Sequence, residues 1–312
     1  MLEPASSTTS SRTSTSSSTS DPASAGRRVR IAARIRLVHP FPSLLNGSAT
    51  FALALLAGGE PSVAARLGLA MTALQFSIGA LNDLVDAPRD RGRRPMKAVA
   101  EGLVRPMSAL AVAVVAAVGG LALAAASGFA ALAVAAAGAA CGYAYDLRLS
   151  RTAWAWLPLA IALPLVPVFA WVGVSGTIPG ALLVLVPIGM LAGGGLAVGN
   201  ALADLEADRT AGVPSLAARL GHRDAAGLHA LALGAAAALA AASLPPGAPA
   251  EAWALVIAGA ATLAAGIATV ARAAGSDLAK GGRLGWQVEA VGTAILGIGW
   301  VVALAESGVG GR

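Results

Sequence analysis

Cysteine and charged residues are scarce in this sequence. Cys141 is the single cysteine among 312 residues, and only 12% of the residues are Asp, Glu, Lys or Arg. One cysteine excludes an internal disulfide and a metal site built from several cysteines. Because 56% of the residues are hydrophobic, the chain has far more apolar surface than a soluble domain of this length could bury. The composition predicts an all-α, polytopic membrane protein.

Several binding patterns are also missing. No glycine-rich phosphate loop with a Walker lysine occurs, which argues against a nucleoside triphosphate machine. The three histidines (His39, His222 and His229) are scattered, and no two have metal-ligand spacing on one helix face. The net charge of +6 has a distribution that fits membrane topology better than nucleic-acid binding, so no nucleic-acid partner is expected.

The chain divides into a polar tail and an apolar domain. Residues 1–26 are mostly Ser, Thr, Ala and Pro without an apolar run, which predicts a disordered tail. A transmembrane domain is expected over residues 27–312, because apolar segments of spanning length follow one another there. We place them at 41–59, 62–82, 107–126, 128–145, 154–174, 180–202, 225–243, 251–272 and 285–305. The prediction is nine transmembrane helices around a central cavity.

Basic residues alternate between the loops. Lys and Arg gather in the loops at 83–106, 146–153, 203–224 and 272–284, and the loops between these have none. Short cytoplasmic loops carry this excess of positive charge. We therefore expect a multi-pass protein of the plasma membrane, in contact with the lipid bilayer, with a cytoplasmic N-terminus.

Two acidic stretches share one spacing. The first reads Asn82-x-x-x-Asp86-x-x-x-Asp90-Arg91 with Asp83 as an extra carboxylate, and the second reads Asn200-x-x-x-Asp204-x-x-x-Asp208-Arg209. Residues four apart lie about 40° apart around a helix, so each set can converge on a ligand. Since the stretches end the second and sixth apolar segments, they predict two related four-helix units plus one helix. Gly195-x-x-x-Gly199 predicts close helix packing, and Pro158, Pro164 and Pro167 predict a kink that helps to open the cavity.

The acidic stretches favour a metal and a diphosphate. Facing carboxylates repel one another unless divalent cations lie between them, and oxygen-only ligands suit Mg²⁺. The alternative is that they are solvated loop charges. Neighbouring basic residues could hold a Mg²⁺-bound diphosphate, or could merely follow the topology rule; they are Arg91, Arg94, Lys97, Arg148, Arg151 and Arg209. An apolar bundle with such a site favours an isoprenyl diphosphate substrate.

Three motifs in order resemble those of the UbiA superfamily of intramembrane prenyltransferases. The first is the Asn82–Asp90 stretch followed by Arg-Pro-Met-Lys-Ala-Val-Ala-Glu-Gly at 94–102, and the second is Asp204-Leu-Glu-Ala-Asp208-Arg-Thr-Ala-Gly-Val-Pro-Ser-Leu. The loop Tyr143-Ala-Tyr-Asp-Leu-Arg148-Leu-Ser-Arg151 is similar to the family's tyrosine-then-basic loop. The resemblance implies a Mg²⁺-dependent enzyme that transfers a prenyl group from its diphosphate to an acceptor, often aromatic.

The resemblance also implies roles for individual residues. Mg²⁺ would be held by Asn82, Asp86, Asp90, Asp204 and Asp208, with Asp83, Asp86 and Asp204 as catalytic residues and with Asn46 and Tyr143 at the cavity. The family often has lysine where Ser150 stands, so Arg148 or Arg151 would replace that contact, and the acceptor stays unassigned. Two other functions stay open, a UbiA-type terpene cyclase and a non-enzymatic cation-coupled transporter. Glu289 is either a functional residue within the membrane or a partner for Arg283 or Lys280.

Overall fold

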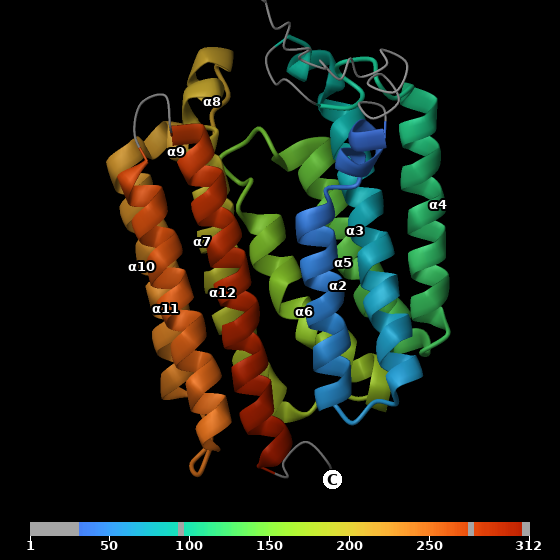
Figure 1. Ribbon diagram of the computed structural model, residues 1–312, viewed down its shortest axis with the longest axis vertical. Coiled ribbons are helices and arrows are strands. Elements are labelled where there is room, and N and C mark those ends of the chain that lie inside the picture. The colour runs from blue at the N-terminus through green and yellow to red at the C-terminus, as the bar shows by residue number, and fades with distance from the viewer. Residues whose placement is uncertain (1–30, 93–96, 274–277, 308–312) are drawn as a thin grey trace, which may run out of the picture.

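The computed structural model describes residues 31–92, 97–273 and 278–307, which form helices joined by short loops (Figure 1). Residues 31–37 are helical. The elements that follow are α2 (Pro40–Leu56), α3 (Pro61–Asp90), α4 (Pro106–Ala125), α5 (Phe129–Ala144), the π-helix η1 (Tyr145–Leu149), α6 (Leu157–Ser175), the 3₁₀-helix η2 (Gly180–Val184), α7 (Leu185–Ala203), α8 (Leu205–Ala211), α9 (Leu216–Leu220), α10 (His222–Ala242), α11 (Ala250–Arg272) and α12 (Leu278–Glu306). The tail predicted at 1–26 lies outside the described residues.

The all-α polytopic fold is confirmed, whereas the number of spans is not. Within the described ranges, eight helical segments are long and apolar enough to cross a membrane, namely α3, α4, α5 with η1, α6, η2 with α7, α10, α11 and α12. The apolar helix α2 is shorter, with 17 residues. The predicted segments match these helices closely, except that α3 continues to Asp90 and α12 begins at Leu278 and not at 285. The first acidic stretch is therefore helical throughout.

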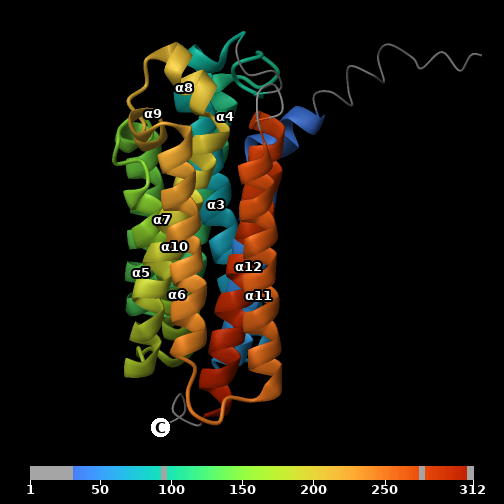
Figure 2. The ribbon, with the colours of Figure 1, turned by 90° about the vertical axis from the view of Figure 1, so that its left-hand side faces the viewer.

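Helices that are neighbours in the sequence also pack side by side. The last helix, α12, packs against α11 and also against α7 and α2, so the two ends of the domain meet. Figures 1 and 2 show that the C-terminal end of α3 lies at the same end of the bundle as α8, which follows α7. Both acidic stretches thus share one end of the molecule. The central cavity and the relation between the two four-helix units stay predictions.

Prolines and glycines bring α6 and α7 close together. Pro158 lies in the first turn of α6, where a missing N–H breaks no helical hydrogen bond, and Pro164 and Pro167 lie inside the helix. On α7, a Cβ added to Gly189 would lie 2.9 Å from the Cα of Pro164. Glycine is therefore required at this crossing. The kink predicted in α6 stays a prediction.

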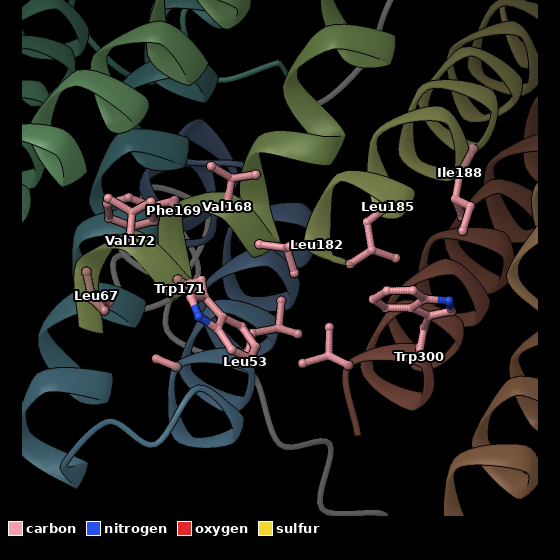
Figure 3. Packing of buried hydrophobic residues seen from close by; sticks show 14 of the residues in the cluster. Leu53, Leu67, Val168, Phe169, Trp171, Val172, Leu182, Leu185, Ile188 and Trp300 are labelled. Atoms are coloured by element: carbon pink, nitrogen blue, oxygen red, sulfur yellow. The ribbon is translucent and has the colours of Figure 1, made fainter. Parts of the chain in front are cut away.

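Separate apolar clusters support the middle of the bundle and its acidic end. The largest cluster joins residues of several helices, with Trp171 from α6 and Trp300 from α12 among them (Figure 3). A second cluster packs the end of α3 against the segment before α4, through Ala80, Ala87, Ala98, Val99 and Val104. A third packs the end of α7 against α9 and α10, through Leu202, Leu205, Ala217 and Ala225. Each acidic stretch is thus supported by its own apolar cluster.

Candidate functional site

Asn82 connects several charged groups at the end of α3. Its Nδ2 atom donates to Asp86 Oδ2 at 3.3 Å and to Asp146 Oδ1 at 3.0 Å. Its Oδ1 atom accepts from Lys97 Nζ at 3.2 Å. The amide of Asn82 therefore lies between two carboxylates on one side and an ammonium group on the other.

Lys97 and Asp83 hold the chain segment that returns from α3 toward α4. The Lys97 Nζ atom lies 3.3 Å from Asp83 Oδ1 and 3.9 Å from Asp90 Oδ2. The other oxygen of Asp83 accepts from the backbone N–H of Val99 at 3.0 Å, and Asp83 is only 2% exposed. Both oxygens of Asp83 are engaged, so this carboxylate fixes Lys97 beside Asn82.

The predicted basic residues differ in their positions. Arg151 Nη2 lies 3.9 Å from Asp86 Oδ1, so the loop after η1 reaches the first acidic stretch. Arg91 and Arg148 are exposed, Arg209 pairs with the exposed Glu206 at 3.2 Å, and Arg94 lies outside the described residues. Of the six candidates, the structure brings Lys97 and Arg151 to the Asn82 cluster.

The π-helix η1 contributes two residues that the sequence analysis did not select. Asp146 is 2% exposed, and its Oδ2 atom is buried without a hydrogen-bond partner. The neighbouring Tyr145 interacts electrostatically with Asp86 of the first acidic stretch and with Asp204 and Asp208 of the second. Both stretches therefore lie close enough to act on one side chain. Single-turn π-helices are frequent at functional sites.

The second acidic stretch is bent at its central residue. Asp204 ends α7 and precedes α8, with φ −100° and ψ 1°. The backbone N–H of Asp208 still donates to Asp204 O at 2.9 Å. The helix is therefore interrupted at Asp204, whereas the first stretch is helical throughout.

The carboxylates are not gathered into a ready metal cage. Among the residues that the structure describes, no three His, Cys, Asp or Glu side chains are grouped closely enough to hold one metal ion. In the first stretch the Asn82 amide group lies between Asp86 and Asp146, where its N–H atoms bind both carboxylates. Binding of an ion by these groups would require the Asn82 amide to turn, so that its oxygen replaces its nitrogen.

The two residues predicted at the cavity have different surroundings. The Tyr143 hydroxyl is hydrogen-bonded to Ser77 Oγ at 2.7 Å, and Ser77 also donates to the carbonyl of Ala113 at 2.7 Å. Tyr143 thus ties α5 to α3 and α4. Asn46 is half-buried in α2, and its backbone carbonyl accepts from Thr50 Oγ1 at 2.8 Å.

His39 immediately precedes α2 and lies next to the same cluster. It has a left-handed backbone with φ 46°, and its side chain packs against Gly79, where an added Cβ would lie 3.2 Å from the His39 ring. Burial, and then the positive charge of Lys97, lower the pKa of His39 to about 4. His39 is therefore neutral at physiological pH and adds no positive charge beside Lys97.

A buried pair deeper in the bundle was not predicted. His229 Nε2 and Glu289 Oε1 are 2.9 Å apart, and His229 Nδ1 lies 2.8 Å from the carbonyl oxygen of Gly195. Glu289 therefore pairs with His229, which the sequence analysis left without a role, and not with Arg283 or Lys280. A Cβ on Gly199 would lie 2.7 Å from His229 Cε1, which explains the small-residue pair on α7. The pair joins α7, α10 and α12.

The fold and the site together define a polytopic membrane protein whose two acidic stretches lie at one end of the helical bundle (Figures 1 and 2). The model of the UbiA prenyltransferase family matches residues 45–284 of the chain. This protein belongs to the UbiA prenyltransferase family. A search of curated proteins found no match.

Solved structures have the same fold at low sequence identity. A digeranylgeranylglyceryl phosphate synthase is 13% identical with a TM-score of 0.65, and the match covers 89% of this chain and 99% of that one. A UbiA homologue from Aeropyrum pernix K1 is 23% identical with a TM-score of 0.64, over 86% of this chain and 99% of that one. A UbiA homologue from Archaeoglobus fulgidus, solved with GPP and Mg²⁺, is 17% identical with a TM-score of 0.62, over 85% and 99%.

Proposed function

We propose that this protein is a Mg²⁺-dependent membrane prenyltransferase. It would transfer a prenyl group from an isoprenyl diphosphate to an aromatic or lipid-like acceptor and release diphosphate. The observation that carries the proposal is that the C-terminal end of α3 and the helix α8, which carry the two acidic stretches, lie at the same end of the bundle (Figures 1 and 2). The A. fulgidus homologue was solved with GPP and Mg²⁺ and also with DMAPP and Mg²⁺, which supports the same classes of ligand here.

The donor set at the acidic ends suits Mg²⁺. The proposed ligands are Asn82, Asp86, Asp90, Asp204 and Asp208, all of which offer oxygen atoms to a hard cation. A buried carboxylate oxygen without a partner, Asp146 Oδ2, lies in the same cluster. When bound, Mg²⁺ would stabilise the negative charge that develops on the leaving diphosphate.

The residues of the chain would bind and orient the donor. Lys97, which pairs with Asp83, and Arg151, which lies beside Asp86, would bind diphosphate oxygens. Arg91, Arg94, Arg148 and Arg209 are proposed to extend this basic surface. Asp83, Asp86 and Asp204 are proposed as the catalytic residues.

The apolar interior would protect the reacting carbon. A central chamber among the helices, with Asn46 and Tyr143 at its wall, is proposed to exclude water from the allylic cation. An electron-rich group on the acceptor would then attack this cation, and the acceptor would lose a proton to a carboxylate at the acidic end.

The acidic end is proposed to face the cytoplasm. In this arrangement the transmembrane domain, 27–312, lies in the plasma membrane with its N-terminus inside, because basic residues follow α3, η1, α7 and α11. Arg66 near the opposite end is hydrogen-bonded to Ser127 at 3.0 Å.

Cysteines introduced in the 175–180 loop should react with an impermeant reagent on intact cells. Reaction only after permeabilisation would contradict this orientation.

Release of diphosphate tests the enzyme. The purified protein should release diphosphate from an isoprenyl diphosphate in the presence of Mg²⁺ and an acceptor, and EDTA should stop the reaction reversibly. Asp86→Ala and Asp204→Ala should each lower the rate by on the order of 100-fold or more, whereas the exposed Asp224→Ala serves as the control. Release without any acceptor would favour a cyclase, and no release with any donor would favour a transporter.

A further inference from the structure

Asp146 is buried, but its carboxylate lacks the hydrogen bonds that a buried side chain usually makes. Its side chain is 2% exposed, Oδ1 accepts from Asn82 at 3.0 Å, and Oδ2 has no partner. Buried polar atoms are nearly always paired, and an unpaired oxygen on a carboxylate is among the most costly exceptions. The hydrogen bond from Asn82 accounts for the burial of Oδ1, but nothing accounts for the burial of Oδ2.

Asp146 shares a hydrogen-bond donor with the first acidic stretch. One amide group, Asn82 Nδ2, binds Asp86 Oδ2 and Asp146 Oδ1, so these two carboxylates lie on the same side of Asn82. The adjacent residue, Tyr145, interacts electrostatically with Asp204 and Asp208. The π-helix therefore brings Asp146 to the first acidic stretch, from a segment that belongs to neither stretch.

The cations nearby do not account for the free oxygen. Lys97 Nζ binds the Oδ1 atom of Asn82, on the side of the amide opposite to Asp146. Arg151 lies 3.9 Å from Asp86 Oδ1, and Arg148 is exposed. Two carboxylates that share one amide repel each other, and a small divalent cation relieves the repulsion by binding both.

We propose that Asp146 is a further oxygen ligand for the divalent cation, supplied by the π-helix between the two acidic stretches. The proposal rests on the proposed function, since it places Asp146 at the same cation. Asp146 would bind the ion through Oδ2, and Oδ1 would give up its hydrogen bond from Asn82 Nδ2 when that amide turns its oxygen toward the ion. The site would then draw on three separate segments, α3, η1 and the junction of α7 with α8.

Binding of Mn²⁺ to the purified full-length protein tests the assignment without turnover. Retained Mn²⁺ is measured by equilibrium dialysis, alone and with inorganic diphosphate, for wild type and Asp146→Asn. Asparagine can keep the contact with Asn82 but removes the carboxylate charge, so the dissociation constant should rise by roughly tenfold or more. The exposed Asp224→Asn on α10 loses the same charge at the same end of the bundle and should bind as wild type does.

Two further variants make every outcome decisive. Asp146→Glu keeps a carboxylate and should bind Mn²⁺ more tightly than Asp146→Asn does. If the asparagine variant folds poorly, Asp146→Glu is compared with wild type in its place. Asp86→Asn reports on the proposed function. If Asp86→Asn loses Mn²⁺ while Asp146→Asn binds as wild type does, Asp146 is not a ligand and the proposed function stands. If wild type itself binds no Mn²⁺ under either condition, both proposals fail.

Discussion

Replacing His229 by leucine should destabilise the protein far more than the loss of one hydrogen bond. The carbonyl of Gly195 can only accept, so His229 Nδ1 carries a hydrogen, and Nε2 shares one proton with Glu289 Oε1. His229 and Glu289 are 1% and 0% exposed, and Glu289 Oε2 already has no partner. His229→Leu would leave both oxygens of a fully buried carboxylate unpaired.

The expected cost is about 3–5 kcal/mol, the usual range when one partner of a buried charged pair is removed. For a chain of this size that corresponds to a fall in Tm on the order of 10 °C. Glu289→Gln should cost much less, because its amide N–H can donate to Nε2. The double variant His229→Leu with Glu289→Leu should recover most of the loss, since no buried polar side chain is left unpaired.

Thermal unfolding in detergent, followed by tryptophan fluorescence, measures these shifts. Ser243→Ala is the matched control, because Trp300 Nε1 donates to Ser243 Oγ at 3.0 Å at the other end of the contact between α10 and α12. It removes one neutral hydrogen bond and should cost about 1–3 kcal/mol. A His229→Leu shift no larger than that of Ser243→Ala, or a double variant as unstable as the single one, would refute this account of the pair.

Three other predictions follow from single contacts. Gly199→Ala should lower Tm by the equivalent of about 1–3 kcal/mol, because its Cβ would lie 2.7 Å from His229 Cε1. Gly227 has open space around it, so Gly227→Ala should not lower Tm. Equal shifts in the two variants would contradict this account of the packing at Gly199. Lys97→Met should raise the KM for the isoprenyl diphosphate about tenfold or more, while the exposed Arg219→Met leaves it unchanged; an unaltered KM would remove Lys97 from the diphosphate site. The pKa of His39 is lowered to about 4 in the folded protein, so His39 is protonated in the unfolded chain at a higher pH than in the folded one. The contribution of His39 to the free energy of unfolding is therefore complete above pH 6.5 and falls as the pH drops toward 4. His39→Asn, which tolerates the left-handed backbone, should flatten the dependence of Tm on pH in that window, and an unchanged slope would exclude His39 as its source.

The membrane helices were predictable because apolar length alone determines them. The segment 107–126 corresponds to Pro106–Ala125, and 251–272 to Ala250–Arg272, since each helix must cover the same bilayer thickness. The spacing of Asn82, Asp86 and Asp90 was also informative, because α3 is a regular helix up to Asp90. Periodicity predicts such features without knowledge of the neighbours.

Other features depend on contacts that no local pattern encodes. Asp146 stands among Arg148 and Arg151 and looks like part of a charged loop, because the sequence does not reveal the π-helix that buries it. The pair of His229 and Glu289 joins residues 60 positions apart on two helices. The break in the helix at Asp204 could not be inferred either, because the second stretch has the same residue types at the same spacing as the first.

The central claim is that the two acidic stretches share one divalent cation. An anomalous-difference map from crystals of the protein soaked with Mn²⁺ tests it most directly. The account predicts a peak within coordination distance of both the Asp86 and the Asp204 carboxylates. A peak bound by one stretch alone, with the other pointing elsewhere, would contradict it.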